Sequence, residues 1–315
     1  MNVFVVIVTF NGAAWIRGAL QSLRDSSHPC TAVVIDNAST DDTVQIIRRE
    51  FPEAVLREAG GNLGFGRGNN LGIAHALQHG ADAIFLLNQD AYVTPQAIGL
   101  MVEFLQSGTG HEIVSPLHCS PDLSRVDPQT HRGYLQRYAA GYLSDACLGQ
   151  IKPHYTIRGI NAAAWMVRAD VFRRVGGFDP LYFMYGEDDD LIQRFEHHGI
   201  RTALLPQARI VHLRAKAPRP AQTWWQTTRA RSERFRSELL VDLKQPRARL
   251  AGRVSRLVAD GVIRPLANVL SSHDVQALVA HLWATARVLT ELPRIQRHAR
   301  LCASPGPHFL DTPSP

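Results

Sequence analysis

Short apolar runs alternate with amphipathic segments over the first hundred residues of the chain. The β-rich apolar runs, which predict strands, are Val3–Thr9, Ala32–Ile35, Val55–Arg57 and Ala83–Leu87. The segments with apolar residues at helical spacing, which predict helices, are Ala14–Leu23, Thr43–Phe51, Leu71–Gln78 and Pro95–Leu105. Strands that alternate with helices indicate βαβ units, so we predict an α/β domain with a mostly parallel twisted sheet flanked by helices, Rossmann-like in its plan.

The same reading continues to about residue 213 and then changes character. Further strands are expected at Arg158–Val167, Thr202–Leu205 and Ile210–Val211, and further helices at Val171–Val175 and Asp189–His198. Beyond Pro218 we expect helices with a basic face, Trp224–Leu243 and Val275–Leu292, and then a Pro-rich end. The predicted organisation is an α/β domain over residues 1–213, a basic helical region over 214–303 and a disordered tail over 304–315.

Polar side chains follow each of the first four predicted strands. Asn11 follows the first strand, Asp36 the second, Asn62 the third and Asp90 the fourth. In open α/β sheets the ligand crevice lies beyond the carboxyl ends of the strands. This placement predicts a ligand site formed by the first hundred residues.

Charge is divided unevenly between the two regions. Residues 1–213 hold 17 Lys/Arg and 21 Asp/Glu (net −4), whereas residues 214–300 hold 17 and 6 (net +11). Basic regions favour anionic partners, and Trp224, Trp225 and the arginines near them suit either nucleic acid or an anionic membrane surface. No apolar stretch approaches the ~20 residues that cross a bilayer, and the apolar N-terminus is interpreted as a strand and not as a signal peptide. None of the four cysteines forms a CxxC pair, which fits a reducing cytoplasm.

Two acidic segments suggest chemistry. Glu187-Asp188-Asp189-Asp190 precedes a predicted helix, and helix capping needs only one of these four acids. Like charges repel unless a cation or tuned pKa values account for them, although Arg194 is placed to pair with Asp190 one turn later. Asn88-Gln89-Asp90 ends the fourth strand, where an oxygen ligand suits a hard cation that holds a diphosphate. A turn aspartate is the alternative there.

The glycine-rich segment Gly60–Asn70 is predicted to be a loop that allows close backbone approach to a nucleotide. It lacks the GK[ST] ending of a P-loop, and it does not follow the first strand as a dinucleotide fingerprint does. A plain turn is equally compatible with these residues. His212 follows a short strand, but nothing local separates it from the other 13 of the 14 histidines.

Taken together, these segments resemble the inverting family 2 glycosyltransferases of the GT-A fold, in the branch that contains rhamnosyltransferases and related cell-envelope enzymes. The motifs that carry the resemblance are Val8–Asn11, Val34–Asp41, Asn62–Asn70, Leu86–Asp90, Val175–Asp179 and Tyr185–Leu191. They stand in family order and cover roughly residues 3–213, so the combination is far more specific than any one motif.

The resemblance implies a role for each matching position. The donor base and ribose would meet Thr9, Asn11, Asp36 and Asn37, and the loop that closes over the nucleotide would contain Asn62, Gly64, Gly68 and Asn69. Asn88-Gln89-Asp90 matches the DxD motif, so Asp90, joined by His212, would hold Mg²⁺ or Mn²⁺ on the diphosphate. Asp188 matches the catalytic base, with Glu187 and Asp190 supporting the acceptor side, and Arg158 would assist donor binding. Asn88 departs from the first DxD acid and supplies only a neutral oxygen.

The function implied is inverting transfer of a rhamnose-like sugar to a glycan or a lipid-linked glycan in cell-envelope polysaccharide synthesis. dTDP-rhamnose is the expected donor and a UDP-sugar the second choice. A nucleotidyltransferase would need a basic glycine-rich loop after the first strand, where this chain reads Thr9-Phe10-Asn11-Gly12. A non-catalytic nucleotide-sugar binding protein is favoured only by Asn88. We expect a cytoplasmic enzyme, peripheral on the membrane through its basic region, with nucleic acid not expected as a partner and an oligomer allowed.

Overall fold

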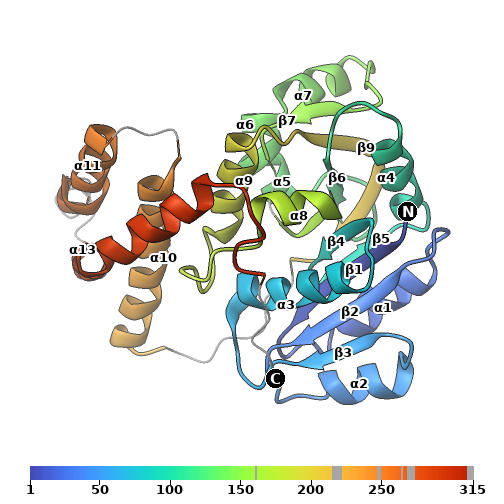
Figure 1. Cartoon of the computed structure of the whole chain (residues 1–315), viewed down its shortest axis with the longest axis horizontal. Helices are drawn as coiled ribbons and strands as arrows, with labels where there is room; N and C mark the ends of the chain where they lie inside the picture. Colours follow the sequence, from blue (N-terminus) through green and yellow to red (C-terminus); the bar gives the residue numbers. More distant parts are fainter. Residues whose placement is uncertain (160–161, 215–221, 247–249, 264, 268–273, 311–315) are drawn as a thin grey trace.

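A single mixed β-sheet forms the centre of the computed structural model, which describes residues 1–159, 162–214, 222–246, 250–263, 265–267 and 274–310 (Figure 1). In these residues the strand order is β3-β2-β1-β4-β8-β6-β9-β5, and β7 pairs with β9. The strands are β1 (Val3–Thr9), β2 (Thr31–Asp36), β3 (Val55–Glu58), β4 (Ala83–Leu87), β5 (Ala91–Val93), β6 (Ile113–Cys119), β7 (Tyr155–Ile157), β8 (Ala164–Arg168) and β9 (Thr202–His212).

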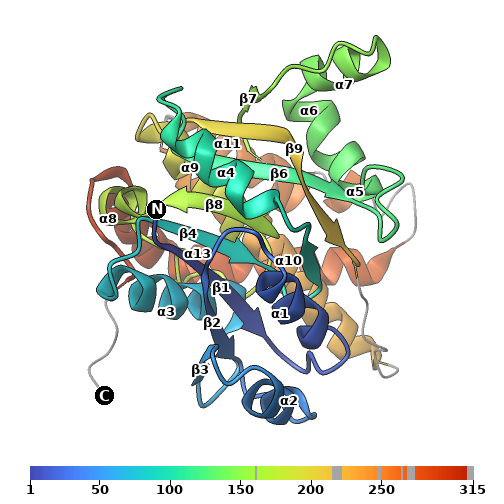
Figure 2. The same ribbon diagram turned by 90° about the vertical axis from the view of Figure 1, so that its right-hand side faces the viewer.

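The helices that lie on this sheet divide between its two faces (Figure 2). On one face, α1 (Ile16–Arg24), α2 (Thr43–Glu50) and α4 (Ala97–Gln106) share a core with β1 and β4. On the other, α3 (Gly64–Gln78), α8 (Ala169–Val175) and α9 (Glu187–His197) pack with Trp165 and Phe178. Ile16 of α1 and Leu191 of α9, which lie among the apolar residues at helical spacing, are fully buried, whereas Ile192 of α9 is partly buried.

The sheet has the expected parallel pairing over its first four strands and between β6 and β9, and it also contains antiparallel pairs. Strands β1, β2, β3 and β4 are parallel, but β8 runs antiparallel to both β4 and β6. The expected strand Arg158–Val167 begins only at Ala164, and the two expected strands at Thr202–Leu205 and Ile210–Val211 are one strand, β9. β6 and β9 stay paired across a β-bulge, where the register shifts between Pro116 and Leu117. The part of β9 opposite this shift, between Leu205 and Arg209, had suggested a break between two strands.

The glycine-rich segment is also different from the expected loop, because helix α3 begins at Gly64. Its glycines let the helix approach β1 closely. A Cβ at Gly68 would lie 2.8 Å from Val8 Cγ1, and one at Gly72 would lie 2.2 Å from Val6 Cγ1. These glycines therefore serve helix–sheet packing, a use that the loop interpretation missed.

Between β6 and β7 the chain forms the short helical segments α5 (Pro128–Thr130), η1 (His131–Leu135), α6 (Gln136–Tyr138) and α7 (Ala140–Cys147). After β9 come α10 (Trp224–Lys244), α11 (Leu250–Val258), η2 (Ala259–Ile263) and α13 (Val275–Ala303), which lie beside α9 at one side of the molecule (Figure 1). Helices α10 and α13 bury Leu240, Val288 and Ile295 together with Tyr182 of the α/β region. No helix in the described residues is long and apolar enough to cross a membrane.

The last described residues are packed, whereas a disordered tail was expected from residue 304. Gly177 N donates to His308 O at 2.9 Å, Gly306 N donates to Arg174 O at 2.8 Å, and Leu310 is buried in the core. Backbone hydrogen bonds and one apolar anchor hold residues 304–310, which Pro content alone does not reveal. Residues 311–315 of the expected tail lie outside the described residues.

Candidate active site

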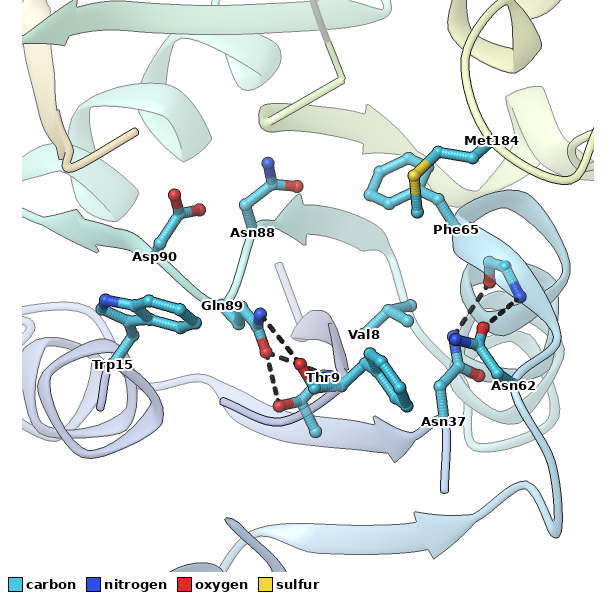
Figure 3. Close-up of a pocket in the computed structure, with 12 residues that line it drawn as sticks. Val8, Thr9, Trp15, Asn37, Asn62, Phe65, Asn88, Gln89, Asp90 and Met184 are labelled. Atoms are coloured by element: carbon cyan, nitrogen blue, oxygen red, sulfur yellow. Dashed lines mark hydrogen bonds between the residues drawn. The ribbon is translucent and has the colours of Figure 1, made fainter. Parts of the chain in front are cut away.

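A first cavity, of about 250 Å³, opens beyond the carboxyl ends of β1 and β4 (Figure 3). From β1 and its following loop come Thr9, Phe10 and Trp15, and from the segment after β4 come Asn88, Gln89 and Asp90. The other lining residues are Val8, Asn37, Asn62, Gly64, Phe65 and Met184. The side chains of Asn88 and Asp90 point into the same space, and Trp15 lies beside Asp90 (Figure 3).

Gln89 ties the two strand ends together below this cavity. Its Oε1 accepts from Thr9 Oγ1 at 2.6 Å and from Phe10 N at 3.1 Å. Gly12 makes this possible, because a Cβ there would lie 2.3 Å from Gln89 Oε1. Thr9 and Gln89 therefore hold each other, and the floor of the cavity is preorganised before any ligand arrives.

The opposite wall is built around Gly64, the first residue of α3. Asn37, which is buried, donates from Nδ2 to Gly64 O at 3.0 Å, and Asn62 Oδ1 accepts from Gly64 N at 3.0 Å. Gly64 has φ +79°, and a Cβ there would lie 2.1 Å from Phe183 O. Only glycine fits this position, which lets the segment containing Phe183 and Met184 lie against the start of α3.

A second cavity, of about 340 Å³, adjoins the first and shares Phe65, Asn88 and Met184 with it. Asp188 and Glu187 at the start of α9 line this second cavity. Gln129, Tyr134, Ala162, Ala163, Tyr185 and Arg214 complete the lining. The acidic motif and the strand-end motifs, about a hundred residues apart in the sequence, thus border two adjoining cavities.

Burial raises the pKa of the acids at the start of α9. Burial, reinforced by the charge of Asp188, raises the pKa of Glu187 to about 8, and burial raises the pKa of Asp188 against hydrogen bonds from the backbone amides of Asp189 and Ala162. The pKa of Asp189 rises to about 6, through burial and the charge of Asp188. Tyr185 and Gly186, just before the helix, have φ of +70° and +85°, so backbone strain lies next to these acids. Raised carboxyl pKa values beside a cavity are typical of proton-transfer groups.

Glu187 predicts a pH-dependent stability. Its pKa rises from 4.5 unfolded to about 8 folded, so the folded state binds more protons between these values and stability falls as pH rises through them. Glu187→Gln should therefore stabilise the protein by up to roughly 3 kcal/mol at pH 8.5 and have little effect at pH 4.5. Urea unfolding at both pH values measures this, with exposed Glu103→Gln as the control within about 0.5 kcal/mol of wild type at each. An equal effect of Glu187→Gln at both pH values would contradict the assignment.

Asp90 lines the first cavity, and His212, which lines none of the described cavities, lies beside it. His212 Nε2 lies 3.5 Å from Asp90 Oδ1, where Ala91 of β5 pairs with His212 of β9. His212 is buried, and its Nδ1 has no hydrogen-bond partner in the described residues. The fully buried His118 lies beside it, with ring centroids 5.8 Å apart, and both ring nitrogens of His118 also lack partners among the described residues. A carboxylate and an imidazole at this distance fit a divalent cation, and this donor set suits Mn²⁺ at least as well as Mg²⁺.

Another group with ligand-like geometry, Asp179, Asp190 and Cys302, is already neutralised by the protein. Lys244 Nζ of α10 lies 2.5 Å from Asp179 Oδ2 and 2.5 Å from Asp190 Oδ1. Arg194 adds a second positive charge 3.1 Å from Asp190 Oδ2, as its spacing predicted. Lys244 and Arg194 balance the two carboxylates, so we interpret this cluster as a buried ion-pair network that joins the C-terminal helices to α9.

Several residues expected at the site do not line either cavity. Asp36 is buried beneath the first cavity, where Oδ2 accepts from Ser39 N at 3.0 Å, and Asn11 Oδ1 accepts from Thr40 N at 2.8 Å. Asn69 bonds within α3 to Phe65 O, and Gly68 packs on Val8. Asp190 belongs to the buried ion-pair network and holds the first turn of α9 in place.

Arg158 also lies elsewhere than expected for a donor-binding residue. Its Nε is 2.7 Å from Glu196 Oε1, and both residues border a third cavity on the far side of α9. Of the lining residues that the sequence did not single out, Arg214 is the most informative. It borders the second cavity and pairs with Asp127 at 2.8 Å. In the sequence, its position two residues after His212 was the only feature that could have indicated Arg214 as a site residue.

Comparison with known proteins defines the class to which this fold and site belong. The family model for glycosyl transferase family 2 matches residues 4–176, and the model for the N-terminal domain of galactosyltransferase matches residues 145–216. The protein is therefore a glycosyltransferase. The first match covers more than half of the chain, so the chain belongs to glycosyl transferase family 2.

Relatives and solved structures agree with this assignment. The N-acetylglucosaminyl-diphospho-decaprenol L-rhamnosyltransferase of Mycobacterium tuberculosis is 27% identical over 235 residues, 67% of this chain and 76% of the relative. Rhamnosyltransferase WbbL of Escherichia coli K12 is 25% identical, covering 67% of this chain and 83% of the relative. The S. aureus TarS 1–349 structure with UDP-GlcNAc has a TM-score of 0.59 at 16% identity, covering 96% of this chain and 88% of that one. The mannosyltransferase PcManGT from Pyrobaculum calidifontis, in complex with GDP-Man and Mn²⁺, has a TM-score of 0.57 at 19% identity over 98% and 84%. These likenesses confirm the GT-A fold.

Proposed function

We propose that this enzyme transfers rhamnose from dTDP-rhamnose, with inversion, to a glycan or a lipid-linked glycan of the cell envelope. The observation that carries the proposal is the pair of adjoining cavities, of which the first is lined by Asp90 and the second by Asp188. Two relatives whose names specify rhamnosyl transfer support the sugar, and the nucleotide-sugar complexes of TarS and PcManGT support the class of donor.

In this proposal the first cavity binds the nucleoside diphosphate. Thr9, Asn37 and Asn62 face the base and ribose, and Gln89 fixes the strand ends that carry them. Asp36, Asn11, Gly68 and Asn69 hold that wall in shape without facing the cavity. Asp90 and His212 would hold Mg²⁺ or Mn²⁺, which when bound neutralises charge on the departing diphosphate. Asn88, which borders both cavities, would contribute a neutral amide toward the diphosphate or the sugar.

Asp188 is the proposed catalytic base in the second cavity. It removes the proton from an acceptor hydroxyl while that oxygen forms a bond to the anomeric carbon, and the bond from this carbon to the diphosphate oxygen breaks. Attack from the face opposite the leaving group inverts the anomeric configuration. Backbone amides of Asp189 and Ala162 hold the carboxylate of Asp188, and Glu187 beside it keeps a proton near neutral pH.

Turnover of nucleotide sugars tests the proposal. The full chain with Mn²⁺ is incubated separately with dTDP-rhamnose, UDP-N-acetylglucosamine and GDP-mannose, and release of the nucleoside diphosphate is measured. We expect dTDP-rhamnose to be turned over fastest. Preferred turnover of UDP-N-acetylglucosamine or GDP-mannose would contradict the rhamnosyl assignment, and no turnover of any donor would contradict the catalytic one.

Asp90→Ala tests the proposed cation site. Of the two proposed cation ligands, this variant keeps only His212, so donor affinity in the presence of Mn²⁺ should fall by at least about tenfold. Titration calorimetry with dTDP, with and without Mn²⁺, separates the metal-dependent part of the affinity. The control is Asp82→Ala, which lies before β4 at the opposite end of the strand and should bind as wild type. Unchanged metal-dependent affinity in Asp90→Ala would remove Asp90 from this role.

The C-terminal helices are proposed to rest on an anionic membrane surface. Part of their basic charge is used inside the protein, because Arg231 pairs with Asp274, Arg236 with Glu291 and Arg287 with Glu233. Trp224 and Trp225 remain 44% and 66% exposed at the start of α10, an arrangement suited to a membrane interface. Sedimentation with vesicles that contain anionic lipid should bring the protein down, and retention of DNA instead would favour nucleic acid.

A further inference from the structure

A third cavity, of about 610 Å³, lies along α9 on the side away from the donor. One wall is the stripe Asp189, Ile192, Gln193 and Glu196, which occupies one face of this helix at i, i+3, i+4 and i+7 spacing. Seven residues at 1.5 Å rise make this wall about 10 Å long, enough for more than one pyranose ring. Of the residues that line this cavity, only Arg158 was expected at the donor site, and it pairs with Glu196 instead.

The second and third cavities share no lining residue, but neighbouring side chains of the same two segments line them. Asp188 lines the second cavity and Asp189 lines the third, so the start of α9 separates them by one residue. Across from it, Tyr134 lines the second cavity and Tyr138 the third, with ring centroids 6.5 Å apart. An acceptor whose reacting sugar lies at Asp188 would therefore enter the third cavity with its next unit.

The polar groups in the third cavity can both donate and accept hydrogen bonds. Two of its charge pairs are satisfied internally, Arg158 with Glu196 at 2.7 Å and Arg256 with Asp242 at 3.5 Å. In the described residues, the Arg137 guanidinium has no ion-pair partner and the Gln193 side chain has no hydrogen-bond partner. Arg137 lies 5.3 Å from the ring centroid of Tyr138. Together with the Asp189 carboxylate, these side chains offer donors and acceptors to a ligand.

This mixture of groups favours a sugar over a diphosphate as the part of the acceptor that the third cavity binds. A diphosphate only accepts hydrogen bonds and is strongly anionic, and the three acids that line the cavity offset the attraction of its three arginines for such an anion. Sugar hydroxyls both donate and accept, and the ring of Tyr138 offers an apolar surface to a pyranose face. The three arginines and three acids make the cavity formally neutral, which suits an uncharged glycan.

We propose that the third cavity binds the second sugar of a glycan acceptor, so that this enzyme extends glycans of at least two sugars. The inference rests on the proposed function, since it takes Asp188 as the place of the reacting hydroxyl. Val241 and Asp242 of α10 and Gln245, which caps the end of that helix, form part of this cavity, and they lie beyond residue 216, where the family matches end. Acceptor choice would thus be set by the C-terminal helices, while the donor side uses the shared part of the fold.

Binding of defined glycans, without donor or metal, tests this subsite. The probes are methyl glycosides of rhamnose and N-acetylglucosamine, as single sugars and as the disaccharides built from them, with affinities measured by saturation-transfer NMR on the full chain. At least one disaccharide should bind about tenfold more tightly than its single sugars, as two or so added hydrogen bonds imply. Tyr138→Ala and Gln193→Ala should each remove most of that gain and leave single-sugar binding unchanged.

The control is Gln136→Ala, which is exposed on the same helical segment as Tyr138, borders no described cavity and should keep the full gain. The proposal is overturned if no disaccharide gains over its single sugars, or if both variants keep the gain. It is also overturned if inorganic pyrophosphate binds and Arg137→Ala abolishes that binding, because the cavity would then serve a diphosphate. Donor turnover is measured separately on each variant, so a disaccharide gain without turnover would contradict the proposed function and leave the subsite standing.

Discussion

Asp188→Asn should lose about 10²–10⁴-fold in the rate of sugar transfer while binding the donor nucleotide as wild type does. The substitution keeps the size of the side chain and its hydrogen bonds with the backbone, but an amide cannot take the proton of the acceptor hydroxyl. Donor affinity should survive because Asp188 lines the second cavity and not the first. Initial rates at saturating donor, with dTDP affinity from calorimetry, measure the two effects separately.

The neighbouring acid supplies the matched control. Asp189→Asn removes an equal charge one residue later, on the side of α9 that faces the third cavity. It should change acceptor affinity and keep kcat within about tenfold of wild type. A wild-type rate in Asp188→Asn, or an equal loss of kcat in both variants, would mean that Asp188 is not the base.

Lys244→Met should destabilise the protein by about 3–5 kcal/mol, the usual effect of removing one partner from a buried ion pair. The Lys244 side chain is 1% exposed and forms ion pairs with both Asp179 and Asp190. Among the described residues, the remaining ion-pair partners are Arg194 for Asp190 and His298 for Asp179. Because Asp190 lies two residues after Asp188, the variant should also lower kcat by loosening the start of α9. Urea unfolding at pH 7 gives the stability change.

The control for Lys244 lies on the same helix. Arg234→Met breaks an i,i+4 pair with Glu238 in which the arginine side chain is 70% exposed, so it should cost at most about 1 kcal/mol. Similar losses in the two variants would show that the buried network contributes no more than a surface pair. A large loss in Lys244→Met alone supports the view that α10 is an integral support of the active site.

Local patterns were sufficient to predict the sheet-forming half of the fold. β1 and β4 have the predicted bounds, because buried parallel strands are continuous apolar runs with polar residues at both ends. The patterns failed where tertiary contacts decide the structure. Gly64–Asn70 is helical with Gly68 fitted against β1 and Gly64 against Phe183, and residues 304–310 are ordered by backbone bonds to Gly177 and Arg174. Neither contact leaves a periodic signal in the sequence.

Part of the candidate site could likewise be predicted from the sequence, and part could not. Strand-end position predicted that Asn11, Asp36, Asn62 and Asp90 would meet, since parallel strands place their ends at one edge of the sheet, and of these four Asn62 and Asp90 line the first cavity. Position could not predict which polar residues face the cavity, so Asp36 and Asn69, which serve the wall behind it, looked equivalent to Asn37. The role of Lys244 could not be predicted for a different reason. Its carboxylate partners lie 54 and 65 residues away in the sequence, and only the fold brings them together.

Real-time NMR of the first sugar product is the most direct test of the central claim, that Asp188 directs a single displacement on a nucleotide sugar in this pair of cavities. The full chain, dTDP-rhamnose and Mn²⁺ are mixed with the glycan acceptors described above, and the anomeric configuration of the new product is read before any free sugar equilibrates. The predicted result is a product with the configuration opposite to that of the donor, formed by the wild type and not by Asp188→Asn. A product with the donor's configuration, or one formed equally fast by Asp188→Asn, would contradict the account.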